Sequence, residues 1–149
     1  MTMIFVTVGS MASFDSLVME VDQLVGDGLF EKGIAQIGNG RYIPKKLEWF
    51  RFKKDLMPFY KQADLIITHG GAGTIFEIIQ TGKKAIAVPN PDSIYNPDIT
   101  IKMSREGYIL LCPSPRHLRY FVERATGWTP RRYEPPPCQI HEIIIKYLL

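Results

Sequence analysis

Six consecutive residues, His69-Gly70-Gly71-Ala72-Gly73-Thr74, combine three glycines with side chains that can form hydrogen bonds. Glycine has no Cβ atom, so a ligand can approach its backbone closely, and glycine also accepts positive φ angles. A helix is predicted to start at about Gly73, so its free N–H groups would point into this loop. A helix start carries about half a positive charge, which suits a phosphate. The segment is therefore a candidate phosphate-binding loop, to which Thr74 can add a hydroxyl group.

Two familiar phosphate-binding patterns do not match this loop. No Gly-Lys-Ser/Thr follows the glycines, and their spacing differs from Gly-x-Gly-x-x-Gly. The alternative is that the glycines only make a tight turn between a strand and a helix. His69 could either bond a phosphate or hold the loop in shape. Glu77 shares a predicted helix face with Thr74. Its carboxylate could accept two hydrogen bonds from a ribose diol or could simply face solvent.

The elements around the loop alternate between strands and helices. Residues 2–8 are apolar and β-rich and precede Gly9-Ser10, which is typical of a strand buried in a parallel sheet. Residues 14–25 repeat apolar positions at helical spacing, with Ser13 as the expected N-cap and Gly26 as the expected stop. Further strands are predicted at 33–37, 49–52, 65–68, 85–88 and 108–111, and further helices at 55–62, 73–80, 95–105 and 116–125. This order predicts an α/β fold, a Rossmann-like parallel sheet with helices on both faces.

In such a sheet, ligands bind at the carboxyl ends of the strands. The loop Gly9-Ser10 and the loop from His69 to Thr74 both follow predicted strands. We therefore expect the two loops at the same edge of the sheet.

Composition sets the broad class. The 149 residues are predicted to comprise a domain at 1–125, a proline-rich linker at 126–138 and a C-terminal helix at 139–149. No apolar run approaches the roughly 18–20 residues that span a bilayer, and no signal peptide is evident, so a cytoplasmic protein is expected. Cys112 and Cys138 are expected to be reduced thiols. A net charge of +3 is too small to indicate nucleic-acid binding.

Several separate blocks resemble the carboxyl-terminal, donor-binding domain of family 28 glycosyltransferases, and above all its small stand-alone subunits of the Alg13, PssE and EpsF type. The likeness runs in order and spacing over residues 3–112. The blocks are Ile4-Phe5-Val6-Thr7-Val8-Gly9-Ser10 with Phe14-Asp15, Ala35-Gln36-Ile37-Gly38, Ala63 to Thr74 with Glu77, Gly82-Lys83 to Pro89-Asn90, and Gly107-Tyr108.

This resemblance implies one half of a GT-B glycosyltransferase that binds a UDP-sugar and inverts the anomeric carbon, without a metal or other cofactor. It implies that His69, Gly70, Gly71, Ala72, Gly73 and Thr74 contact the diphosphate and sugar, that Glu77 contacts the ribose, and that Gly9 and Ser10 form the cleft wall. The acceptor, a lipid-linked glycan, would bind a membrane-anchored Alg14/PssD-like partner subunit. This chain would then lie at the cytoplasmic membrane face through that partner.

One stretch departs from the family pattern. The family usually carries Asn-His-Gln-x-Glu before its next helix, whereas this chain has Asn96-Pro97-Asp98-Ile99-Thr100. Asn96 remains a candidate donor contact, and Asp98 is an outside candidate for the catalytic base, which is otherwise expected on the partner. The departure also supports a non-catalytic binding subunit. A UDP-GlcNAc 2-epimerase-like enzyme shares the architecture, but such enzymes carry both halves in one chain.

Two further segments have open roles. Arg41 to Lys54 contains six basic residues and four aromatic residues. It could contact an anionic membrane or a partner protein, or it could be a basic strand whose aromatic side chains lie in the core. The predicted C-terminal helix has a wide apolar stripe, which could pack on its own domain or against the partner half.

Overall fold

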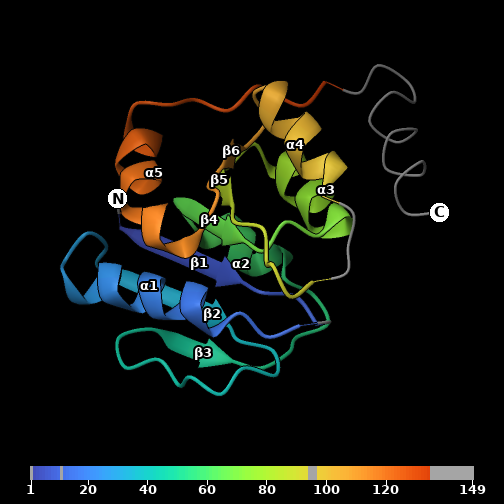
Figure 1. Cartoon of the computed structure of the whole chain (residues 1–149). Helices are drawn as coiled ribbons and strands as arrows, with labels where there is room; N and C mark the ends of the chain where they lie inside the picture. Colours follow the sequence, from blue (N-terminus) through green and yellow to red (C-terminus); the bar gives the residue numbers. More distant parts are fainter. Residues whose placement is uncertain (1, 11, 94–96, 135–149) are drawn as a thin grey trace.

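The computed structural model describes residues 2–10, 12–93 and 97–134. Within them, helices surround a sheet of six parallel strands (Figure 1). The strands are β1 (Met3–Thr7), β2 (Lys32–Gln36), β3 (Glu48–Phe50), β4 (Leu65–Thr68), β5 (Lys84–Ala87) and β6 (Leu110–Leu111). The helices are α1 (Asp15–Gly26), α2 (Met57–Gln62), α3 (Ala72–Thr81), α4 (Asp98–Arg105) and α5 (Leu118–Thr126), with a 3-10 turn at Pro115–His117 before α5. The predicted α/β fold, with a Rossmann-like parallel sheet, is confirmed.

The strand order places both glycine-marked loops at one crevice. The order is β3-β2-β1-β4-β5-β6, so the chain builds outward from β1 to β3 and then returns to the other side of β1. Thr7 at the end of β1 is aligned with Gln36 of β2 and with Thr68 of β4. Ligands of open α/β sheets bind where the strand order reverses in this way. The reversal here lies between the carboxyl ends of β1 and β4.

Two apolar layers hold the helices onto the sheet. On one face, α1 and α5 cover a core that includes Ile4, Val6 and Leu17. On the other face, α2, α3 and α4 cover a core that includes Phe5 and Ile66. Alternate residues of β1 enter opposite layers, as expected for a strand that is buried on both faces. Figure 1 shows the sheet between these two groups of helices.

Three local predictions can be compared with the structure. The third helix begins at Ala72, one residue before the predicted Gly73, and Gly82 ends it in the left-handed conformation as predicted. The prediction of Ser13 as an N-cap was wrong, because Phe14 occupies that position and no side chain caps the helix. Gly26 is the last residue of α1, and the chain reverses only at Gly28, where φ is +85°.

The part of the predicted linker that the structure describes packs against the domain. The Arg131 N–H donates a hydrogen bond to the Gly107 carbonyl, and the Tyr133 ring packs edge-on against Phe76. Residues 135–149, with Cys138 and the predicted C-terminal helix, lie outside the described residues, so that helix and the proposed domain division stay predictions. Along the described chain, no helix is long and apolar enough to cross a membrane.

Candidate functional site

The two glycine-marked loops meet at the crevice as predicted. The His69 N–H extends the β1–β4 ladder by donating to the Thr7 carbonyl across 3.2 Å. This bond holds the residues after β4 beside those after β1. Gly9 and Gly70 then turn with φ angles of +77° and +93°, a conformation that glycine adopts without the steric cost that other residues pay.

The His69 imidazole packs between the two loops. A Cβ atom at Gly9 would lie 2.6 Å from its Nε2 atom, and one at Gly71 would lie 2.7 Å from the same atom. Glycine at both positions therefore makes room for the ring. Burial lowers the pKa of His69, although hydrogen bonding of the imidazole to the Thr7 backbone acts in the opposite direction. Of the two roles that the sequence left open for His69, its packing supports that of holding the loop.

The start of α3 supplies backbone amides at this edge. Gly71 precedes the helix, and the Ile75 N–H donates to its carbonyl across 2.9 Å. The N–H groups of Ala72, Gly73 and Thr74 come before this first helical bond and have no partner within the helix. Among the described residues, a Cβ atom on Gly73 would meet no atom within 4 Å, so the space beside this part of the helix is open to them. Free amides at a helix start suit an anion.

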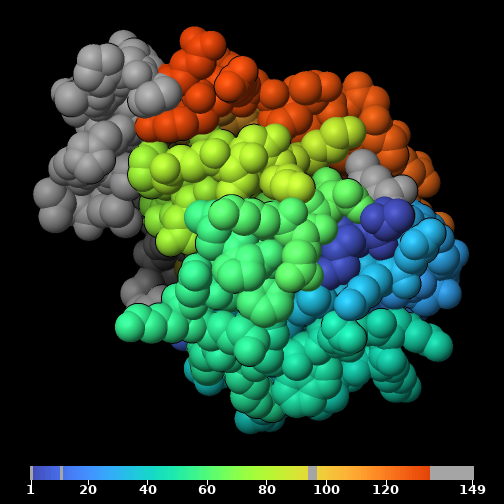
Figure 2. All heavy atoms as spheres, turned by 180° about the vertical axis from the view of Figure 1, so that it is seen from behind, coloured from blue at the N-terminus to red at the C-terminus, as the bar shows by residue number. Residues whose placement is uncertain are grey.

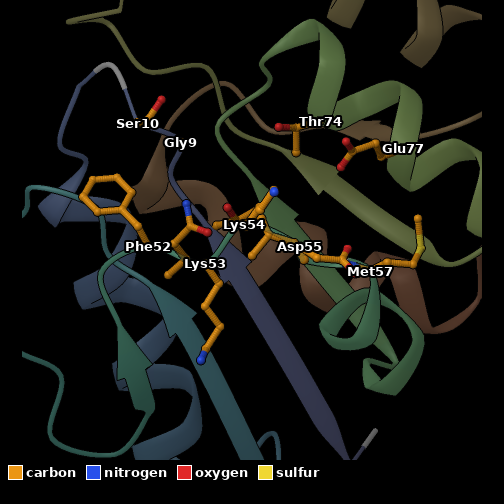
Figure 3. Close-up of a pocket in the computed structure, with 12 residues that line it drawn as sticks. Gly9, Ser10, Phe52, Lys53, Lys54, Asp55, Met57, Thr74 and Glu77 are labelled. Atoms are coloured by element: carbon orange, nitrogen blue, oxygen red, sulfur yellow. The ribbon is translucent and has the colours of Figure 1, made fainter.

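A pocket of about 360 Å³ opens between the two halves of the sheet (Figure 3). Thr74 and Glu77 project into it from α3, opposite the segment from Phe52 to Met57. The Gln36 side chain is buried, and its carbonyl oxygen has no hydrogen-bond partner among the described residues. A ligand with a donor group could satisfy that oxygen. The lining residues are Thr7, Gly9, Ser10, Gln36, Phe52, Lys53, Lys54, Asp55, Leu56, Met57, Thr74 and Glu77.

Glu77 is poised as a hydrogen-bonding group in this pocket. Partial burial raises the pKa of its carboxyl, and the neighbouring charge of Asp55 adds to the rise. Lys53 lies on the same wall as Asp55, but its ammonium group rests over the Phe50 and Phe59 rings at 5.0 and 5.9 Å. The pocket thus carries both a carboxylate pair and nearby cations.

The predicted site residues fall into four groups. Gly9, Ser10, Thr74 and Glu77 line the pocket, whereas His69 to Gly73 form the adjoining loop and helix start. Asn96 lies outside the described residues. Asp98 is exposed on the first turn of α4 and does not line the pocket. No group of three or more His, Cys, Asp or Glu residues that could hold a metal ion occurs in 2–10, 12–93 and 97–134.

Thr100 shows what the departure from the family pattern does in this chain. The residue is fully buried, and its hydroxyl donates a 2.8 Å hydrogen bond to the Gly70 carbonyl. Where the family usually has glutamate, this chain therefore has a hydroxyl that anchors the glycine loop. The sequence alone does not reveal this role, because the contact joins residues that are 30 positions apart.

We expect Thr100→Val to lower the free energy of unfolding by about 1–2 kcal/mol, because the buried Gly70 carbonyl loses its partner. The loop should also loosen and bind nucleotide more weakly. Urea unfolding of both proteins measures the first effect. Thr100→Ser keeps the hydroxyl and serves as the matched control. If Thr100→Val is as stable as the parent protein, the hydrogen bond to Gly70 does not stabilise the fold.

His69 gives the site a predictable pH dependence. Its pKa is lowered from the ordinary value of 6.5, so the unfolded chain takes up a proton before the folded chain does. The stability that depends on a neutral His69 side chain is fully present above pH 6.5. It is lost as the pH falls from there to the folded-state pKa, by at most about 1.4 kcal/mol per pH unit.

Urea unfolding between about pH 7.5 and about pH 5.5 measures this slope. We expect His69→Gln to reduce the slope relative to the parent protein. An unchanged slope in His69→Gln would contradict the prediction.

The wall from Phe52 to Met57 and the Gln36 amide were missed as site residues. Two signals in the sequence pointed toward them. Gln36 lies in one of the blocks of the family resemblance, and Lys53 and Lys54 end the basic, aromatic segment. Only the pairing of β2 with β1 and β3 brings these residues to the crevice.

The strand order and the crevice at the start of α3 define a Rossmann-like α/β domain with a ligand-binding edge. Comparison with known proteins agrees. The chain belongs to the family of the glycosyltransferase family 28 C-terminal domain, which matches residues 3–97.

Curated relatives extend the match. The chain is 32% identical over 132 residues to the "UDP-N-acetylglucosamine transferase subunit ALG13" of Mus musculus. This match covers 74% of the present chain and 11% of the mouse protein. The human protein of the same name is 31% identical over 126 residues, which is 75% of this chain and 11% of that protein. The chain thus spans about a ninth of the length of these two relatives.

Solved structures share the fold. An NMR structure of ALG13 has a TM-score of 0.66 at 20% identity and covers 98% of this chain and 94% of that one. The crystal structure of Acinetobacter baumannii MurG has a TM-score of 0.58 at 16% identity and covers 99% of this chain and 52% of that one.

Proposed function

We propose that this chain is the donor-binding subunit of an inverting glycosyltransferase and that its donor is UDP-N-acetylglucosamine. The observation that carries the proposal is the open start of α3 at the crevice, where the amides of Ala72, Gly73 and Thr74 adjoin a pocket of about 360 Å³. A diphosphate at these amides would gain both hydrogen bonds and the favourable helix dipole. The names of the curated relatives support N-acetylglucosamine as the sugar.

The nucleoside would occupy the pocket beside the helix start. Glu77 lies about one helical turn after Thr74, and both side chains line this space. A ribose diol in the pocket can therefore reach the Glu77 carboxylate. The unsatisfied carbonyl oxygen of Gln36 offers an acceptor for a further ligand donor. Gly9 and Ser10 form the opposite wall near the phosphates.

The reaction would be a direct displacement at the anomeric carbon. An acceptor hydroxyl oxygen forms a bond to that carbon, the bond from the carbon to the phosphate oxygen breaks, and UDP leaves with the electron pair. The hydroxyl proton passes to a general base. The part of this chain is electrostatic, since the amides at the start of α3 stabilise the charge that grows on the departing diphosphate.

We place the general base on a partner subunit. Asp98 is the outside candidate on this chain, but it does not line the donor pocket. The partner would be membrane-anchored, of Alg14/PssD type, and would hold a lipid-linked glycan acceptor. The reaction would need no metal or other cofactor, and this chain would lie at the cytoplasmic membrane face through its partner.

A non-catalytic, nucleotide-sugar-binding subunit is the second candidate. The observation that favours it is Thr100, which stands where the family usually has a carboxylate and uses its hydroxyl to hold Gly70. A chain that keeps the loop but loses a polar donor contact could bind the donor without supporting turnover.

Calorimetric titration with UDP, UDP-N-acetylglucosamine, UDP-glucose and UDP-galactose tests the proposal. We expect UDP and UDP-N-acetylglucosamine to bind, and transfer to occur only after the partner subunit is added. Donor binding without transfer in the complete complex would favour the non-catalytic subunit. If none of the four ligands binds, the proposed function is wrong.

A further inference from the structure

The segment from Arg41 to Lys54, here called the basic–aromatic segment, exposes apolar side chains to solvent. Five large hydrophobic residues are exposed in the described chain, and three of them lie in this stretch. Ile43 is 41% exposed, Trp49 is 42% exposed and Phe52 is 49% exposed. The stretch therefore holds a concentration of apolar surface that neither core layer uses.

The same segment holds the excess positive charge of the protein. It contains six basic residues and one acidic residue, Glu48, which gives it a net charge of +5. Because the whole chain carries only +3, the remaining residues have a net charge of −2. The protein is therefore polarised, with its cationic charge on the part of the molecule that also exposes Ile43, Trp49 and Phe52.

The position of β3 explains why its aromatic residues divide between core and surface. In the described part of the chain, β3 is an edge strand that pairs with β2 alone. Phe50 points toward one core layer and packs against Phe59, with ring centroids 4.9 Å apart. Successive side chains of a strand point to opposite faces, and Trp49, next to Phe50, is 42% exposed. A core role for the aromatic residues thus holds for Phe50 but not for Trp49.

Buried and clamped groups hold the segment in a fixed shape. The Asp22 carboxylate on α1 accepts hydrogen bonds from the backbone N–H groups of Lys45, Lys46 and Leu47 at 2.9, 2.7 and 3.2 Å. The Lys45 and Lys46 side chains are consequently displayed on the surface. Their turn is anchored, so little ordering would be needed for binding.

Hydrogen bonds of Arg51 fix the position of its side chain beside Trp49. The Arg51 guanidinium donates to the carbonyls of Gly38 and Gly40 at 3.0 and 2.9 Å, and its Cζ atom lies 5.8 Å from the centre of the Trp49 ring. The ring is thus held beside a fixed cation at the surface.

We propose that the basic–aromatic segment binds the surface of an anionic lipid bilayer. Clusters of four to eight Lys and Arg residues are typical of anionic-lipid binding, and tryptophan favours the membrane–water interface. Lysine is depleted in protein–protein interfaces, yet four of the six basic residues here are lysines. Single apolar side chains set among lysines also suit a fluid lipid surface, which needs no complementary shape.

This surface adjoins the pocket. Phe52, Lys53 and Lys54 end the segment and also line the pocket. Figure 2 shows this part of the chain forming the lower end of the molecule. A bilayer bound there would lie beside the pocket mouth. The proposal stands on the exposure and charge of the segment and does not depend on which ligand the pocket holds.

Vesicle co-sedimentation of the full chain tests the proposal, with phosphatidylcholine vesicles that contain or lack phosphatidylglycerol. We expect binding only to the anionic vesicles and weaker binding at high salt. Each basic side chain near an anionic surface strengthens binding about fivefold, so Lys45→Glu with Lys46→Glu should weaken it at least about 20-fold. The control is Arg116→Glu with Arg124→Glu, which makes the same change in charge at exposed positions of the 3-10 turn and α5.

Trp49 provides a direct optical readout. The chain has two tryptophans, so Trp128→Phe leaves Trp49 as the sole emitter. Its fluorescence should shift to shorter wavelength when anionic vesicles are added. UDP titration of the Lys45→Glu, Lys46→Glu variant checks the donor pocket separately.

Three outcomes would overturn the proposal. These are no binding of the parent protein to anionic vesicles, equal losses in the two charge-reversal variants, and an unchanged Trp49 spectrum. Capture of an acidic protein by the segment without any vesicle binding would assign the surface to a protein partner instead.

Discussion

Gly73→Asp should weaken UDP binding at least about 100-fold while leaving the protein folded. Gly73 lies in the first turn of α3, and a Cβ atom there would meet none of the described atoms within 4 Å. The new carboxylate would compete with the diphosphate for the helix-start amides and repel it. Two such charges about 4 Å apart interact by several kcal/mol at a protein surface, and each 1.4 kcal/mol changes the affinity about tenfold.

The same substitution should not destabilise the fold. Replacing glycine within a helix gains up to about 1 kcal/mol, and an acidic residue in the first turn is favourable with the helix dipole. Calorimetric titration and thermal unfolding together separate the two effects. Gly73→Asn has the same shape without the charge and should bind UDP far better than Gly73→Asp. If the two variants bind UDP with equal affinity, the helix start does not attract the diphosphate electrostatically.

Gly71 is a less informative position for this test. A Cβ atom at Gly71 would lie 2.7 Å from Nε2 of His69, so any side chain would displace the imidazole. Loss of binding in a Gly71 variant would therefore mix loop distortion with charge repulsion. Gly73 separates the two because its surroundings are open.

Asp22→Ala should lower the free energy of unfolding by about 3 kcal/mol. The Asp22 carboxylate is buried and accepts hydrogen bonds from the Tyr42 hydroxyl and from three backbone N–H groups, Lys45 to Leu47. Burial opposes ionisation of Asp22, but these hydrogen bonds outweigh it and hold the pKa of the carboxyl below its ordinary value. Removing the carboxylate would leave one buried and three part-buried donors without this partner, at about 1–3 kcal/mol for each that water does not reach.

Asp15 offers the matched comparison. Its carboxylate accepts from the Arg41 and Tyr42 N–H groups at 3.2 and 3.3 Å, so it anchors the same stretch of chain. These bonds are fewer, longer and more exposed than those of Asp22. Asp15→Ala should therefore cost less, about 1 kcal/mol. Urea unfolding of both variants measures the difference, and a smaller loss for Asp22→Ala than for Asp15→Ala would contradict this account.

The sheet and its loops could be predicted from local patterns. The buried strand at Leu65–Thr68 was predicted with its observed bounds. Its four apolar or β-branched residues lie between a polar residue, Asp64, and the polar and glycine residues His69-Gly70. The meeting of Gly9 with the loop after this strand followed from a general property of parallel sheets. Such predictions need only the order of the elements.

The residues that support the site could not be predicted in this way. Asp22 and Thr100 look like ordinary helix residues in the sequence, yet each bonds backbone groups more than 20 positions away. The packing of His69 between two glycines likewise depends on the pairing of β1 with β4. Hydrogen-bond partners at this distance are fixed by tertiary structure, which the spacing of residue types does not encode.

An NMR titration of the ¹⁵N-labelled full chain with UDP would locate the nucleotide on individual backbone amides. We expect the largest chemical-shift changes at Gly9, Ser10 and the amides from Gly71 to Thr74. Saturable changes that cluster elsewhere on the chain, with the start of α3 unperturbed, would contradict this expectation.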